Sequence, residues 1–168
     1  MDNLFLIALI VGLSLAVLID ATKRRIPNWL TVGIACAGLI LQTWSGHGSG
    51  LGTGIIGIAV GLLCFLPLHI FGAMGGGDVK LLAGVGAFLG PVNVFLAALI
   101  TMMVGGVIGL AYITAKGGLL MMIRRYHSML MLMVAGQLQY IPPAPGEAAG
   151  LRFPYALAIA CGTVLAII

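Results

Sequence analysis

Residues 4–25 read LFLIALIVGLSLAVLIDATKRR and decide the class of fold. The stretch is apolar from Leu4 to Ile19, and it then meets Asp20 and the basic cluster at residues 23–25. A secretory signal peptide carries its positive charge before the apolar run and a small-residue cleavage site after it, and neither feature is present here. We therefore expect an uncleaved first helix that crosses a membrane.

The composition of the whole chain agrees with this interpretation. Of its 168 residues, 61% are apolar and only 7% are charged, whereas an average globular domain carries about 25% charged residues. The mean hydropathy is +1.20. These values exclude a soluble enzyme, a disordered chain and a nucleic-acid-binding protein, and they favour a single integral-membrane domain over residues 1–168.

At about 20 residues for each membrane-spanning helix, the chain predicts an all-α polytopic protein with about six transmembrane helices. The run at 79–90 is short for a span, and a turn is expected at 91–93. The segment near 117–140 holds Arg124 and Arg125 at its centre. Two adjacent arginines in the middle of a bilayer would cost several kcal/mol, so we expect this segment to be interfacial or re-entrant. The expected spans are 4–19, 29–44, 51–71, 79–90, 94–114 and 155–168.

The basic residues predict the orientation of the chain. With the amino terminus outside and six crossings, all eight lysines and arginines fall on the cytoplasmic side, as the positive-inside rule requires. If the short segment at 79–90 does not cross, everything after it changes sides.

Two of the four acidic residues, Asp20 and Asp78, then lie at the cytoplasmic ends of expected helices. Ionisable groups beside glycine-rich backbone at a membrane boundary are candidates for function. Two carboxylates that share a proton can activate a water and protonate a departing amide nitrogen. The alternative is structural, because Asp78 could be a helix N-cap and Asp20 the solvated end of the first helix.

Three motifs occur in order along the chain: DATKRRIPN at 20–28, GGGDVKL at 75–81 and FPYALAIA at 153–160. They resemble the first aspartate motif, the GxGD motif and the Pro-Tyr segment of the type IV prepilin peptidases. GxGD alone is a weak signal in a chain with 26 glycines, but three motifs with six-helix spacing are specific.

The resemblance implies an aspartic endopeptidase of the cytoplasmic (inner) membrane. Such an enzyme removes the leader of prepilins or pseudopilins at the cytoplasmic face, with Asp20 and Asp78 as its catalytic pair. The segment between the first two spans leaves no room for the cysteine-rich insert of the long bacterial members. The chain thus resembles the short, peptidase-only form of tight-adherence pilus systems, and we expect no N-methylation.

Further residues are predicted to bind substrate or to position the loops. Pro27 and Asn28 are expected to shape the loop that brings Asp20 to Asp78. The glycines Gly75, Gly76 and Gly77 leave the backbone open to an extended peptide, and Lys80 either tunes the carboxylates or anchors the chain to lipid.

The scattered histidines and cysteines have no ligand spacing, so we expect no metal, no cofactor and no nucleic-acid partner; membrane lipids are the other expected contact. The competing hypotheses are a GxGD peptidase for other membrane substrates such as preflagellins, and a small proton or cation transporter. A transporter would need a polar path across the bilayer, whereas both acids lie at one face.

Overall fold

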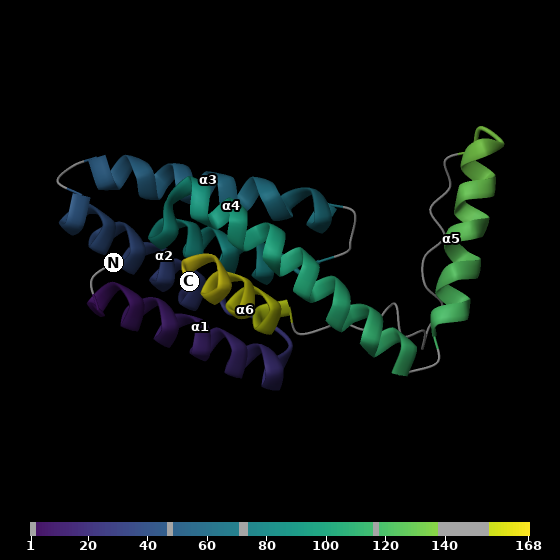
Figure 1. The fold of residues 1–168 in the computed structure, drawn as a ribbon, viewed down its shortest axis with the longest axis horizontal. Helices are drawn as coiled ribbons and strands as arrows, with labels where there is room; N and C mark the ends of the chain where they lie inside the picture. The colour runs from purple at the N-terminus through teal and green to yellow at the C-terminus, as the bar shows by residue number, and fades with distance from the viewer. Residues whose placement is uncertain (1–2, 47–48, 71–73, 116–117, 138–154) are drawn as a thin grey trace. The chain divides into compact units, whose positions relative to one another are not determined.

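In the computed structural model, the described residues are 3–46, 49–70, 74–115, 118–137 and 155–168. All their regular elements are α-helices (Figure 1), so the expected all-α polytopic membrane architecture is confirmed. Three helices are long and apolar enough to cross a membrane, namely α1, α3 and α4, and α6 is a shorter apolar helix. The helices are α1 (Asn3–Lys23), α2 (Asn28–Gly46), α3 (Ser49–Ile70), α4 (Gly76–Ala115), α5 (Leu119–Val134) and α6 (Tyr155–Ile167).

The helix α4 contains the fourth and fifth expected spans, which are two arms joined at Gly90. Gly90 has φ 73° and ψ 179°, a conformation that glycine adopts without the steric cost of a side chain. The turn was expected at 91–93, and this position is wrong. The break falls on Gly90, and Pro91 already lies in the second helical arm. Proline suits this first helical position because its missing amide would have no partner there.

The two arms of α4 reverse the chain direction at that break. Tyr155 interacts electrostatically with Asp78 at the start of the first arm. Its ring also packs on Gly105 of the second arm, where an added Cβ would lie 2.7 Å from Tyr155 Cε1. Asp78 and Gly105 thus lie near one another although about 40 Å of continuous straight helix would separate them.

Glycines allow α3 to pack directly on the first arm of α4. Gly57 faces the backbone of Gly86, and a Cβ at Gly61 would lie 2.7 Å from the Leu82 carbonyl oxygen. Small residues permit such close approach of helices in lipid, where close packing and not hydrophobic transfer drives their association. This contact fixes the position of the arm that carries Asp78.

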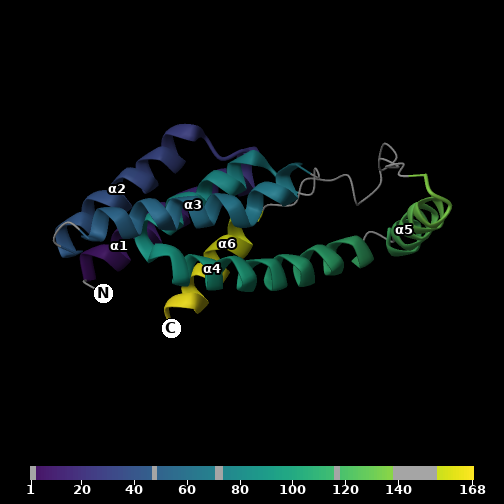
Figure 2. The ribbon, with the colours of Figure 1, turned by 90° about the horizontal axis from the view of Figure 1, so that it is seen from above.

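The remaining helices of this bundle pack against the two arms of α4 and against one another. Phe5 of α1 and Phe88 of α4 form an edge-to-face pair with ring centroids 5.2 Å apart, a favoured aromatic geometry. Gly12 of α1 packs on Ile34 of α2. Helix α6 returns to the bundle (Figure 2), where Gly162 packs on Thr101 of the second arm of α4.

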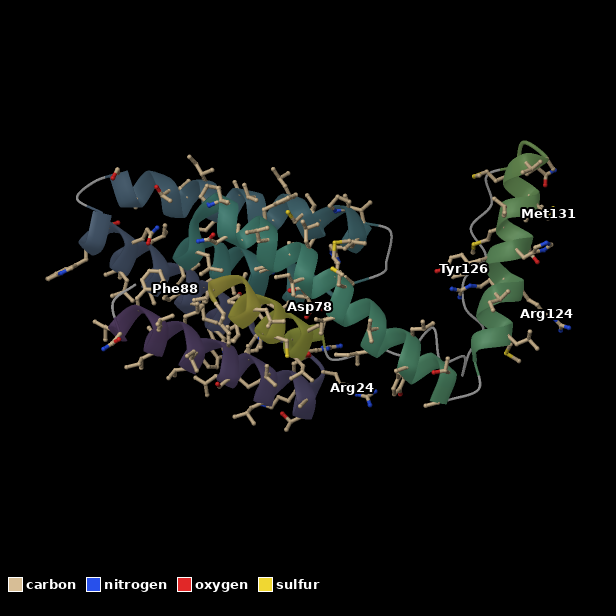
Figure 3. The ribbon with its side chains drawn as sticks, in the orientation of Figure 1. Arg24, Asp78, Phe88, Arg124, Tyr126 and Met131 are labelled. Carbon is tan, nitrogen blue, oxygen red and sulfur yellow. The ribbon has the colours of Figure 1, made fainter. Side chains whose placement is uncertain are left out.

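The chain divides into two compact units, residues 1–105 with 154–168, and residues 106–153. The second unit contains α5, in which Arg124 and Tyr126 point to opposite sides (Figure 3) and the Arg125 guanidinium lies 5.2 Å from the Tyr126 ring centroid. The interfacial or re-entrant placement of this segment stays a prediction, as do the single-domain organisation and the orientation of the chain in the membrane.

Candidate active site

Asp20 lies in the last turn of α1, which ends in a left-handed cap. The amide of Arg24 donates to the Asp20 carbonyl at 2.8 Å, and Arg24 has φ 50°. This single bond from the first residue past the helix is the αL capping arrangement, which usually employs glycine. The cap ends α1 at Lys23, one turn after Asp20.

Asp78 is the third residue of α4, so its suggested role as the N-cap is wrong. Its amide donates to the Gly75 carbonyl at 3.1 Å, and its carboxylate accepts a hydrogen bond from the Gly75 amide. These reciprocal contacts are those of an acidic residue at the third position of a helix. Gly76 and Gly77 form the first turn of α4 together with Asp78.

The structure brings the two carboxylates together from separate helices. Asp20 is 6% exposed and Asp78 is 8% exposed, and the two side chains interact electrostatically. Figure 3 shows Asp78 and Arg24 towards one end of the bundle and Phe88 away from it. Burying two acidic groups within electrostatic range of each other is costly unless they share a proton or have polar partners.

The start of α6 contacts both acidic residues. The amide of Ala156 donates to Asp20 Oδ2 at 3.3 Å, and Tyr155 interacts electrostatically with Asp78. The Pro-Tyr segment was recognised in the sequence, but its contacts with the aspartates were not predicted. Spacing alone could not indicate them, because they connect helices that are far apart in the chain.

The segment 26–28 joins the two aspartate motifs. A Cβ at Gly77 would lie 3.1 Å from the Ile26 Cβ, and the Lys80 ammonium donates to Asn28 Oδ1 at 2.9 Å. The carbonyl of Pro27 accepts the first amides of α2, from Leu30 at 3.1 Å and Thr31 at 3.4 Å. Residues predicted to position the loops thus lie at the contact between the loops.

His69 is a further residue of this region, and it was not among the predicted site residues. It lies in the last turn of α3, and its Nδ1 is 3.0 Å from the Met74 carbonyl oxygen, which accepts the bond. A Cβ at Gly76 would lie 3.3 Å from the His69 ring. The only available signal was a histidine just before the glycine run. In the part of the chain that the structure describes, no three His, Cys, Asp or Glu side chains group as metal ligands do.

Comparison with known proteins defines the class to which this fold and site belong. The model of the type IV leader peptidase family matches residues 7–110, which include both aspartates and the glycine motif. The chain therefore belongs to the type IV leader peptidase family.

Individual members of the family resemble this chain over part of their length. The chain is 34% identical over 119 residues to a prepilin leader peptidase/N-methyltransferase of Legionella pneumophila, covering 67% of this chain and 41% of the relative. It is 32% identical over 105 residues to the protein of that name from Aeromonas salmonicida, covering 58% and 36%. A preflagellin peptidase of Methanococcus voltae is 33% identical over 83 residues, covering 48% and 36%. The matches thus span about two fifths of these relatives, and no solved structure matches the chain.

Proposed function

We propose that the chain is a membrane-embedded aspartic endopeptidase that removes the leader from type IV prepilin-like proteins. Asp20 and Asp78 are its catalytic pair in this proposal. The observation that carries it is that two buried carboxylates from different helices lie within electrostatic range of each other. Membership of the leader peptidase family and the names of the relatives supply the substrate class.

The chemistry needs one carboxylate ionised and the other protonated. The ionised carboxylate takes a proton from a water as the water oxygen attacks the scissile carbonyl carbon, and the protonated one donates to the carbonyl oxygen. The resulting tetrahedral diol then collapses, the C–N bond breaks and the departing amine takes up a proton. Buried acids held by helix ends suit this role because little reorganisation is needed during the reaction.

The loop residues support the pair by positioning it. In the proposal, the contact of Ile26 with Gly77 sets the separation of the loops, and the hydrogen bond from Lys80 to Asn28 closes them. Pro27 precedes α2 and its carbonyl accepts the first amides of that helix, while Gly75 and Gly76 permit the close approach of the Asp78 carboxylate and the His69 ring.

The distribution of side chains supports a site at the cytoplasmic face of the inner membrane. Lys23, Arg24, Arg25 and Lys80 lie close in sequence to the two aspartates, and positive residues favour the cytoplasmic side. Large apolar side chains are exposed along α1 and α3, which suits contact with membrane lipids. They include Leu4, Ile7, Val11, Leu15, Leu18, Ile55, Ile56 and Leu63.

The proposed activity is proteolysis without N-methylation. Only residues 24–27 lie between α1 and α2, which is too short for an inserted domain. The Methanococcus relative favours a second substrate class, because its name describes a peptidase for preflagellins. A prepilin and a preflagellin offered in parallel distinguish the two, since the enzyme cleaves its own class with the higher kcat/KM.

Cleavage of a model prepilin in membranes tests the proposal. The comparison is between the native chain, Asp20→Asn and Asp78→Asn, with Asp2→Asn as a control that makes the same change elsewhere. Asparagine keeps the size of the side chain but cannot exchange the proton. We expect each site variant to insert and accumulate but to lose cleavage by at least a thousandfold, while the control stays within twofold of native.

Cleavage at a near-native rate by either site variant would show that the corresponding aspartate has a structural role only. The proposed dyad would then be wrong. Failure of the native chain to cleave any leader-bearing substrate would overturn the proposed function itself.

A further inference from the structure

The first turn of α6 interacts with both aspartates. Tyr155 is the first residue of α6, and it interacts electrostatically with Asp78. The next residue is Ala156, whose amide donates to Asp20 Oδ2 at 3.3 Å. The titratable atom of a tyrosine is its hydroxyl oxygen, so the hydroxyl of Tyr155 lies within electrostatic range of the Asp78 carboxyl. Two successive residues of one helix therefore each interact with one aspartate of the proposed pair.

The ring of Tyr155 is held in a tight space. The residue is half-buried and packs against the core of the bundle. A Cβ at Gly105 of α4 would lie 2.7 Å from Tyr155 Cε1 and 3.4 Å from Tyr155 Cδ1, which is closer than carbon atoms prefer. The ring thus lies directly on the helix backbone at Gly105, and this packing sets the position of the hydroxyl.

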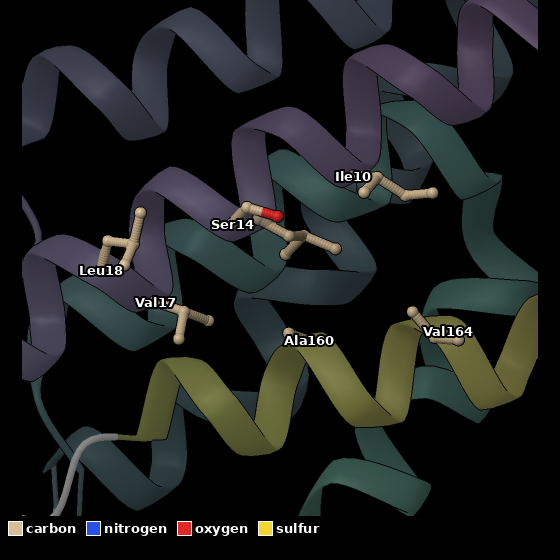
Figure 4. A pocket seen from close by; sticks show the side chains of 7 residues that line it. Ile10, Ser14, Val17, Leu18, Ala160 and Val164 are labelled. Atoms are coloured by element: carbon tan, nitrogen blue, oxygen red, sulfur yellow. The ribbon is translucent and has the colours of Figure 1, made fainter.

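The rest of α6 holds its first turn in place. Figure 4 shows α6 alongside α1, with Val17 of α1 and Ala160 of α6 on the two sides of an apolar pocket. Gly162 of α6 packs on Thr101 of α4. Helix α6 therefore contacts both the helix that carries Asp20 and the helix that carries Asp78.

A tyrosine hydroxyl suits a carboxyl group that changes its protonation state. Both aspartates are buried, and buried carboxyl groups need polar partners. A backbone amide, such as that of Gly75 at Asp78, can only donate. A hydroxyl can donate to an ionised carboxylate and can also accept from a protonated carboxyl. It can therefore hold Asp78 in both states that the proposed reaction requires.

We propose that Tyr155 is a positioning residue of the active site. Its hydroxyl holds the Asp78 carboxyl while the Ala156 amide holds Asp20, so the first turn of α6 sets the separation at which the two aspartates share a proton. This inference rests on the proposed peptidase function. Tyr155 acts on the reaction through Asp78.

The first test removes the hydroxyl and keeps the ring. With a model prepilin as substrate, we expect Tyr155→Phe to lower kcat about tenfold to a hundredfold, as for the loss of a hydrogen bond to a charged group, and to leave KM within twofold. Tyr126→Phe makes the same change at an exposed tyrosine of α5 and leaves both constants within twofold. An unchanged kcat for Tyr155→Phe, or an equal loss in the control, would overturn the proposal.

The second test displaces the ring without removing a polar group. Gly105→Ala adds a methyl group against the ring, and Gly106→Ala is the matched control, because a Cβ there has no neighbouring atom within 4 Å. We expect Gly105→Ala to lower kcat about tenfold in the native chain, but less than twofold in the Tyr155→Phe chain, which has no hydroxyl to displace. Gly106→Ala has no such effect in either chain.

This pair of backgrounds distinguishes positioning from packing. If Tyr155 serves only to pack, the phenylalanine ring meets the same methyl group, and Gly105→Ala lowers kcat equally in both chains. That result would overturn the proposal.

Infrared spectroscopy separates this inference from the proposed function, since it needs no substrate. The band of the Asp78 carboxyl in the full chain is identified by its loss in Asp78→Asn. We expect this band to move in Tyr155→Phe and to stay in place in Tyr126→Phe. If the native chain cleaves no leader-bearing substrate but the band moves, the peptidase assignment fails and Tyr155 remains a residue that holds Asp78. If cleavage occurs but the band does not move, the two aspartates stand and the positioning role is wrong.

Discussion

Replacing Gly77 by alanine tests whether the contact between the two aspartate motifs sets the catalytic geometry. The added methyl group would lie 3.1 Å from the Ile26 Cβ and 3.5 Å from the Ile26 amide nitrogen and carbonyl oxygen. Carbon atoms prefer separations of about 3.5–4.0 Å, so the loops must separate by about 0.4–0.9 Å. Ile26 is only 8% exposed and packs into the core, so the displacement must move one aspartate relative to the other.

The size of the expected effect follows from that displacement. A misplacement of about 1 Å can lower a catalysed rate by about a hundredfold. We therefore expect kcat to fall about tenfold to a hundredfold, which corresponds to about 1.4–2.7 kcal/mol of activation free energy. The assay is initial-rate cleavage of a model prepilin by the purified native and variant chains.

The matched control is Gly33→Ala. Gly33 is also helical, but a Cβ there has no neighbouring atom within 4 Å. Both substitutions raise helix propensity by about 1 kcal/mol, so general destabilisation cannot explain a difference between them. If Gly77→Ala keeps kcat within twofold of native, or if Gly33→Ala loses as much activity, the reasoning from loop separation is refuted.

Three further predictions concern residues around the dyad. Lys80→Ala should lower kcat/KM about fivefold, equivalent to about 1 kcal/mol for its hydrogen bond to Asn28. If the two residues act together, adding Asn28→Ala to this variant should cause little further loss of kcat/KM. His69→Phe keeps an aromatic ring but cannot donate to the loop carbonyl, so we expect kcat to fall about tenfold with KM within twofold; unchanged kcat would make His69 a packing residue only. Arg24→Gly removes about 1 kcal/mol of strain from a backbone in the left-handed conformation and should raise the Tm in detergent by about 2–4 °C. The control Arg25→Gly removes the same charge and should leave the Tm unchanged. Equal shifts in Tm for the two variants would contradict the strain argument.

The helices themselves were largely predictable from the sequence. Their apolar runs are bounded by charged, glycine or proline residues, and the last expected span at 155–168 nearly coincides with α6. The reversal at Gly90 was placed a residue or more too late, since proline at 91 was read as part of the turn. Proline is equally common at the first position of a new helix, and only backbone geometry distinguishes the two.

The sequence predicts which residues form the candidate site more readily than it predicts the contacts among them. Asp20 and Asp78 are separated from other acids in the sequence, and the motifs that contain them are recognisable. The amide bond from Ala156 and the bond from His69 to Met74 depend on how helices pack. Local spacing contains no information about such contacts, because they arise between elements that are distant along the chain.

Close contacts at glycines position the segments that carry the two aspartates of the proposed pair. Gly57 and Gly61 position the first arm of α4, and Gly77 then sets its distance from the loop that follows Asp20. In lipid such contacts gain their energy from close approach, and each is lost when a single methyl group is added. The site is therefore most sensitive at glycines that have no chemical role, and substitutions there should lower kcat without removing a catalytic group. The same reasoning explains why the GxGD pattern keeps glycine at 75 and 77 in this chain: a Cβ at 75 would lie 3.0 Å from Asp78 Oδ2, and one at 77 would press on Ile26.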